Sequence, residues 1–67
     1  MSVARITEIS AGSPTSFEDA IKVGVERAAR TLRNVKGAWV KEQQVVVNGE
    51  KISEFRVNLM VTFILED

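Results

Sequence analysis

The sequence contains no cysteine and no histidine. The absence of cysteine excludes disulfide bonds and thiolate nucleophiles. The absence of histidine excludes catalytic centres that pair a serine or a cysteine with an imidazole base, and it leaves only carboxylates for a zinc site. A small tautomerase would need an amino-terminal proline as its base, whereas the single proline is the internal Pro14. We therefore predict that the chain is not an enzyme.

Neither sign of charge is in excess, because nine basic residues balance nine acidic ones. A nucleic-acid-binding surface would need a basic patch, so we expect no nucleic-acid partner. No apolar run approaches the roughly 20 residues that a membrane helix needs. The first residues also lack a basic segment followed by an apolar stretch, which would mark a secretory signal. We expect a cytoplasmic protein that does not interact with membranes.

The chain is short, with 67 residues that we assign to a single domain, 1–67. A chain of this size buries only about 60% of its unfolded surface, so it is marginally stable alone. Such chains usually gain stability from disulfides, a metal or oligomerisation. The missing cysteines and histidines leave oligomerisation as the expected device.

The most informative stretch is 38–65, which reads as two alternating strands joined by Asn48-Gly49. Asn-Gly between apolar-rich runs is a strong hairpin signal, because a type I′ turn needs positive φ at both central residues. With these two residues as the loop, Lys41 lies opposite Arg56 and Trp39 lies opposite Asn58.

A period of two sorts the side chains of this hairpin onto two faces. The apolar face carries Ala38, Val40, Val46, Phe55, Val57, Leu59, Val61, Phe63 and Leu65. The second face mixes polar and large apolar residues: Gly37, Trp39, Lys41, Gln43, Val45, Val47, Ile52, Glu54, Arg56, Asn58, Met60, Thr62 and Ile64. Water-facing surfaces rarely gather so many large apolar groups, so we interpret the second face as a contact surface for another copy and for a ligand.

The residues before the hairpin predict a strand and a helix. The strand covers Val3 to Ile9 and is followed by a loop at 10–15. Gly12 in this loop lacks the spacing and the lysine of a phosphate-binding loop, so we interpret it as a turn residue. The helix begins at Ser16, with Asp19 in a capping box, or at Ser13 with proline in the first turn.

The predicted helix runs to about Arg33, and Asn34 is a suitable stop. Its apolar stripe has helical spacing and consists of Phe17, Ile21, Gly24, Val25, Ala28 and Leu32. Gly24 weakens the helix, and we expect that it allows a close approach to the sheet. The order is strand, helix, strand, strand. If the third strand lies between the other two, the fold is α+β, with a three-stranded antiparallel sheet and one helix packed on one face.

This order and length resemble the dodecins, small β-α-β-β proteins that form hollow dodecamers and of which many bind flavins. The resemblance spans nearly the whole chain. Its segments are Ser13-Pro14-Thr15-Ser16-Phe17-Glu18, Arg27-Ala28, Thr31 to Val35, Val40-Lys41-Glu42, Phe55, and Val61-Thr62-Phe63-Ile64-Leu65-Glu66.

The resemblance implies where a flavin would bind. Flavin-binding dodecins stack the ring between tryptophans of the second strand and hold its polar edge with a glutamine of the third. Those positions carry Gly37 and Arg56 here, so a dodecin subgroup without that tryptophan is the closer match. The single tryptophan, Trp39, is two residues from Gly37 on the same face, about 6.6 Å along the strand. Trp39 is either an interface anchor or a stacking partner for a small aromatic ligand. Arg56 either holds a polar ligand group or forms a salt bridge with Glu54 of a neighbouring chain.

Two functional hypotheses follow from the resemblance. The first is a flavin-binding and storage protein that forms a homododecamer and holds FMN or riboflavin near Trp39, Arg56 and Gly37. The alternative is a structural dodecamer that has lost flavin binding and holds a divalent cation or another small ligand. Carboxylates of Glu54, Glu66 and Asp67, gathered at symmetry axes, are the oxygen ligands available for such a cation.

Overall fold

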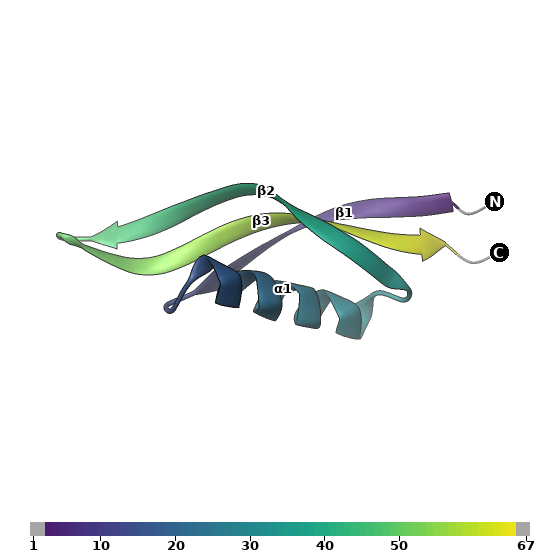
Figure 1. Ribbon diagram of the computed structural model, residues 1–67, viewed down its shortest axis with the longest axis horizontal. Helices are drawn as coiled ribbons and strands as arrows, with labels where there is room; N and C mark the ends of the chain where they lie inside the picture. The colour runs from purple at the N-terminus through teal and green to yellow at the C-terminus, as the bar shows by residue number, and fades with distance from the viewer. Residues whose placement is uncertain (1–2, 66–67) are drawn as a thin grey trace.

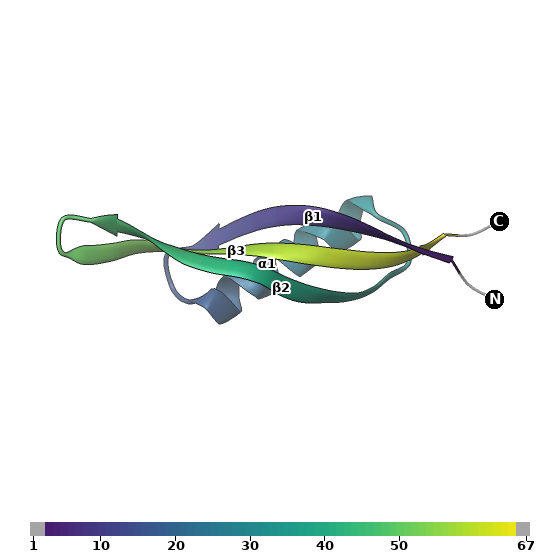
Figure 2. The same ribbon diagram turned by 90° about the horizontal axis from the view of Figure 1, so that it is seen from above.

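A computed structural model describes residues 3–65. The elements follow the order β1 (Val3–Ser13), α1 (Phe17–Thr31), β2 (Val35–Asn48) and β3 (Lys51–Leu65). β3 lies between β1 and β2 in one sheet, and both pairings are antiparallel (Figure 2). This arrangement confirms the predicted α+β fold with its single helix on one face of the sheet.

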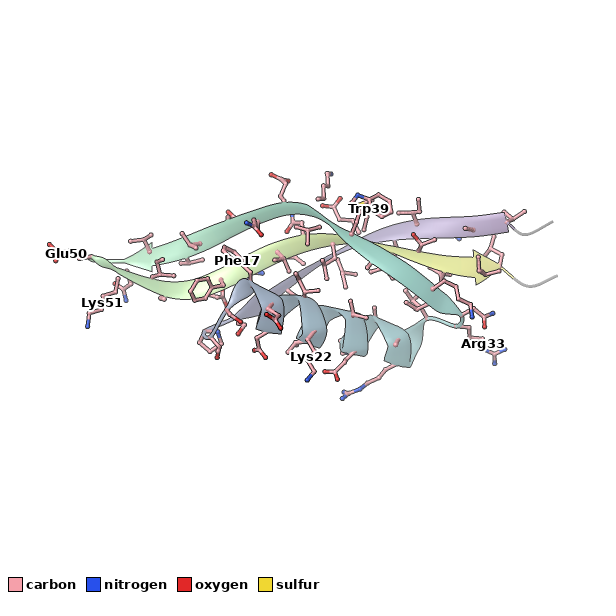
Figure 3. The ribbon with its side chains drawn as sticks, in the orientation of Figure 1. Phe17, Lys22, Arg33, Trp39, Glu50 and Lys51 are labelled. Carbon is pink, nitrogen blue, oxygen red and sulfur yellow. The ribbon has the colours of Figure 1, made fainter. Side chains whose placement is uncertain are left out.

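The molecule is elongated, with extents of 51 × 19 × 14 Å. α1 runs along one side of the sheet, and the far part of the β2–β3 hairpin extends beyond the first turn of α1 (Figure 1). Glu50 and Lys51 lie at the tip of this extension, well away from the helix (Figure 3). One helix therefore covers only part of one face.

The start of α1 is fixed by two serine side chains. The backbone N–H of Asp19 donates to the Ser16 hydroxyl at 3.0 Å, which confirms the predicted N-cap. The buried Ser13 hydroxyl donates to the Asp19 carboxylate at 2.7 Å and accepts the Thr15 N–H at 3.0 Å. At the other end the helix stops at Thr31, two residues before the predicted end.

The core lies between α1 and the middle of β3. Its fully or nearly fully buried apolar residues are Ala20, Ala28, Val57, Leu59 and Val61. Partly buried residues pack around them: Ile9, Ala11, Phe17, Ile21, Val25, Leu32 and Val35. The predicted stripe is confirmed, although it omits Ala20, which is fully buried.

Gly24 allows the close approach that the sequence predicts. A Cβ at this position would lie 2.9 Å from Leu59 Cδ1 and 3.0 Å from the Ala11 Cβ. Both distances are shorter than ordinary contacts, so the missing side chain lets the helix rest directly on β1 and β3.

β1 is longer than predicted, because it continues through Ser13 instead of ending at Ile9. Its last residues keep pairing with β3, with Gly12 opposite Arg56 and Ser13 opposite Phe55. The prediction of a loop from residue 10 is therefore wrong. Ala11 continues the inward-facing alternation begun by Ile9, and packing against the helix outweighs the turn propensity of the serines and glycine.

The predicted hairpin register is wrong by two residues near the turn. Asn48 pairs with Lys51, so the loop residues are Gly49 and Glu50. Gly49 has φ of 68°, which is the positive first position of a type II′ turn rather than the predicted type I′. Trp39 consequently lies opposite Met60 instead of Asn58. A two-residue shift preserves the face of every side chain.

A β-bulge between Val40 and Glu42 does change the faces. Beyond it, Val45 lies opposite Phe55, whose ring packs edge-to-face on Phe17 of the helix at 5.2 Å. Directly opposed residues share a face, so Val45 belongs to the helix side. Val46 opposes Glu54 and belongs to the other side. Both assignments reverse the prediction, because the extra bulge residue inverts the alternation.

Candidate ligand-binding face

The side of the sheet opposite α1 is not covered by any element in residues 3–65 (Figures 1 and 2). We call it the open face. The register assigns to it Ala4, Ile6, Glu8, Ser10 and Gly12 of β1, Gly37, Trp39, Glu42, Gln44 and Val46 of β2, and Glu54, Arg56, Asn58, Met60, Thr62 and Ile64 of β3.

Trp39 lies near the middle of the open face and points away from α1 (Figure 3). Its side chain is 50% exposed, and it lies opposite Met60. One row further along, Gly37 lies opposite Thr62, which in turn pairs with the 49% exposed Ile6 of β1. Apart from Gly37 and its two chain neighbours, no heavy atom of residues 3–65 lies within 4 Å of the place where a Cβ of Gly37 would be. Trp39 and Gly37 thus form an apolar area with open space beside the indole.

The whole of β2 beyond its first residue is exposed, from Lys36 to Asn48. β2 is also an edge of the sheet, so one row of its backbone groups has no strand beside it within the described residues. β3, by contrast, has three fully buried residues. The side of the molecule that carries Trp39 is therefore the least covered by its own chain.

Arg56 does not lie next to Trp39 in one chain. It is four residues from Met60 along β3, which corresponds to about 13 Å. Its Nη1 donates to Glu54 Oε1 at 2.7 Å and its Nη2 donates to Ser10 Oγ at 3.1 Å. The salt bridge expected with Glu54 of a neighbouring chain is thus formed within the same chain.

Gly12 makes room for this ion pair, a role that the sequence analysis missed. A Cβ on Gly12 would lie 2.7 Å from Glu54 Oε2 and 3.2 Å from Arg56 Nη1. The interpretation of Gly12 as a turn residue is wrong, because it is a strand residue directly opposite Arg56. Only the full length of β1 reveals this contact, and the sequence pattern had ended the strand three residues earlier.

A second ion pair crosses the open face, where Lys41 Nζ lies 3.3 Å from Glu8 Oε1. Glu8 and Glu54 are therefore both paired with a base. Within residues 3–65, no group of three or more acidic side chains is close enough to hold a metal ion. Of the predicted cation ligands, Glu66 and Asp67 lie outside the described residues. Within the same range, no helix combines the length and apolar character needed to cross a membrane.

The dodecin family model matches residues 3–66. The chain belongs to the dodecin family. Among curated proteins, calcium dodecin from Mycobacterium tuberculosis is 35% identical over 63 residues, which cover 94% of this chain and 89% of that protein.

Two solved dodecin structures illustrate the likeness of the fold. The dodecin from Streptomyces davaonensis has a TM-score of 0.93 at 32% identity, covering 98% of this chain and 97% of the other. The structure of calcium dodecin from Mycobacterium tuberculosis, described with a novel calcium-binding site, has a TM-score of 0.83 at 34% identity. It covers 96% of this chain and 91% of the other. The predicted family and fold are confirmed, whereas the subgroup without the stacking tryptophan stays a prediction.

Proposed function

We propose that this dodecin is a non-catalytic flavin-binding and storage protein that assembles into a hollow homododecamer in the cytoplasm. The observation that carries the proposal is the half-exposed Trp39 at the centre of a sheet face that its own chain leaves open. A flat aromatic ring can stack on such an indole with offset or edge-to-face geometry.

The need for sister chains comes from the exposed apolar residues. Ile6, Trp39 and Val46 are each more than 40% exposed on the open face. The hairpin beyond the helix adds Val47 at 59% and Ile52 at 52%. Large exposed apolar surfaces mark protein or ligand contacts, and a chain of this size gains stability by burying them. Self-association through this side of the molecule removes them from water.

The residues present fit a flavin in part. Trp39 supplies a stacking surface, and the open space at Gly37 leaves room beside it. Arg56 departs from the family's glutamine, because an amide both donates and accepts hydrogen bonds whereas a guanidinium only donates. Arg56 therefore suits the carbonyl oxygens of the ring but not its N–H group.

The distance of about 13 Å along the strands between Trp39 and Arg56 also bears on the site. In the proposed site, a flavin stacks on Trp39 of one chain and meets Arg56 of another, so the site needs the assembly.

Titration of riboflavin and FMN with the purified protein tests the proposal. We expect quenching of flavin fluorescence at micromolar concentrations. The variant Trp39→Ala should bind roughly 5- to 150-fold more weakly, because losing one stacked aromatic contact costs about 1–3 kcal/mol.

Two controls make the titration decisive. Val23→Ala removes a comparably exposed apolar residue from α1, on the other side of the molecule, and should leave quenching unchanged. The mass in solution, measured by light scattering, should be that of twelve chains for each protein. Absence of quenching by the unmodified protein would refute flavin binding, and a stable single chain would refute the assembly.

A second candidate function is the binding of a divalent cation, which the similarity to calcium dodecin favours. The described residues of one chain contain no acidic cluster for it, so carboxylates from several chains would have to meet at a symmetry axis. Calorimetric titration with Ca²⁺ and thermal unfolding with and without a chelator test this candidate. An unchanged Tm and an unchanged mass after chelation would refute a structural cation.

A further inference from the structure

We infer that Glu54 tunes Arg56 to accept a neutral oxygen of a flavin rather than the phosphate at the end of the FMN ribityl chain, and that Gly12 is the residue that permits this arrangement. The inference deepens the proposed function and rests on it. Glu54 would act as a positioning and charge-setting residue, since it reaches the ligand through Arg56.

The position of the guanidinium is fixed from two strands. Glu54 and Arg56 lie two residues apart on the same face of β3, and Nη1 donates to the carboxylate at 2.7 Å. Ser10 lies on β1, opposite Asn58, and its hydroxyl accepts from Nη2 at 3.1 Å. Contacts on two different nitrogens hold the plane of the guanidinium, so its orientation on the open face is defined.

Hydrogen-bond capacity remains after these two contacts. A guanidinium carries five N–H donors, and Arg56 uses one on each of two nitrogens. The remaining donors can serve a neutral carbonyl oxygen of a ligand. The side chains of Arg56 and Glu54 are 36% and 35% exposed, so these donors are accessible in the chain.

The charge of the pair argues against an anionic ligand group. Glu54 neutralises Arg56 at close range, so a phosphate that approaches the guanidinium gains little from it and is repelled by the carboxylate. Without Glu54, the planar guanidinium of Arg56 would be free to donate two parallel hydrogen bonds to a phosphate, which is the geometry that favours phosphate binding. The pair therefore removes the advantage that FMN would gain by placing its phosphate against Arg56.

Gly12 leaves the space that the Glu54 carboxylate occupies. A Cβ at this position would lie 2.7 Å from Oε2 and 2.8 Å from Cδ of Glu54. Any other residue at position 12 would push the carboxylate away from its present place. The absence of a side chain at Gly12 thus allows the Glu54 carboxylate to lie between β1 and Arg56.

The test compares riboflavin with FMN in the assembled protein by fluorescence titration. In the unmodified protein, we expect FMN to bind no more tightly than riboflavin. In Glu54→Gln, which keeps the shape but removes the charge, the preference should move toward FMN by about fivefold or more, and the gain should decrease as salt rises. Glu42→Gln is the matched control, because it removes the same charge elsewhere on the open face.

A second variant covers the case in which Glu54→Gln fails to assemble. Gly12→Ala keeps the carboxylate but displaces it, so it should move the preference in the same direction by a smaller factor. If both flavins bind and either assembled variant leaves the preference unchanged, the inference is overturned while the proposed function stands. If neither flavin binds the unmodified protein, the proposed function fails and this inference fails with it.

Discussion

The two faces of β3 differ although they belong to one strand. Val57, Leu59 and Val61 point toward α1 and have no exposed surface. The residues between them, Asn58 and Met60, point to the open face and are only partly buried in the same chain. One side is closed by a helix that the sequence itself supplies. The other side has no such cover within residues 3–65.

The charges follow the same division. Both ion pairs formed within residues 3–65, Lys41–Glu8 and Arg56–Glu54, involve residues of the open side. Exposed ion pairs add little stability, about 0–1 kcal/mol each. The helix side contributes stability through apolar packing, and the open side carries the ligand contacts that we propose.

The largest expected loss of unfolding free energy comes from a substitution in the core between α1 and β3. Leu59→Ala removes a fully buried side chain from the core and should cost about 2–5 kcal/mol of unfolding free energy. Met60→Ala is the matched control, because Met60 is the next residue of β3 and points to the open face. In urea unfolding at low protein concentration it should cost clearly less. Equal losses for the two variants would contradict the division between the faces.

Replacing each of two glycines by alanine should change the unfolding free energy by a smaller amount, with opposite signs at the two positions. Gly24→Ala should gain up to about 1 kcal/mol of helix propensity but lose about 1–3 kcal/mol to overpacking against Ala11, for a net loss near 1 kcal/mol. Gly37→Ala meets open space and should stabilise the chain by about 0.4–1 kcal/mol through the unfolded state. Thermal unfolding of both variants measures the difference. A stabilising Gly24→Ala would show that helix and sheet are less tightly packed than described.

An effect of similar size sharpens the comparison at the helix terminus. Ser16→Ala removes the hydroxyl that caps α1 and should cost about 1 kcal/mol. Thr15→Ala, an exposed neighbour whose side chain makes no such bond, is the control. The fluorescence of Trp39 should be the same in both variants, since the cap acts on the other side of the sheet. A changed Trp39 emission in Ser16→Ala would mean that the two faces are coupled.

The sequence predicted the fold where local chemistry and periodicity agreed. The cap at Ser16, the apolar stripe of the helix and the inward residues of β3 all follow from spacing alone. The register of the hairpin could not be predicted, because a shift of two residues leaves the same side chains on the same face. The bulge beside Lys41 inserts one residue without any glycine or proline to mark it.

The candidate site was predicted only in part for a related reason. Trp39 on the uncovered face follows from alternation within β2, and the structure places it there. The pairing of Arg56 with Glu54 and Ser10 depends on β1 reaching as far as Gly12. Turn-forming residues hid that part of β1, so the sequence offered no signal for a contact between residues more than 40 positions apart.

The sheet order has a consequence for how the protein is made. β1 is the first strand to leave the ribosome, but its partner in the sheet, β3, is the last of the three to be synthesised. β1 therefore emerges with no strand to pair with until β3 has been made. Pairing between segments so distant in sequence is slower than closing a local hairpin, so we expect the joining of β1 to β3 to limit the folding rate.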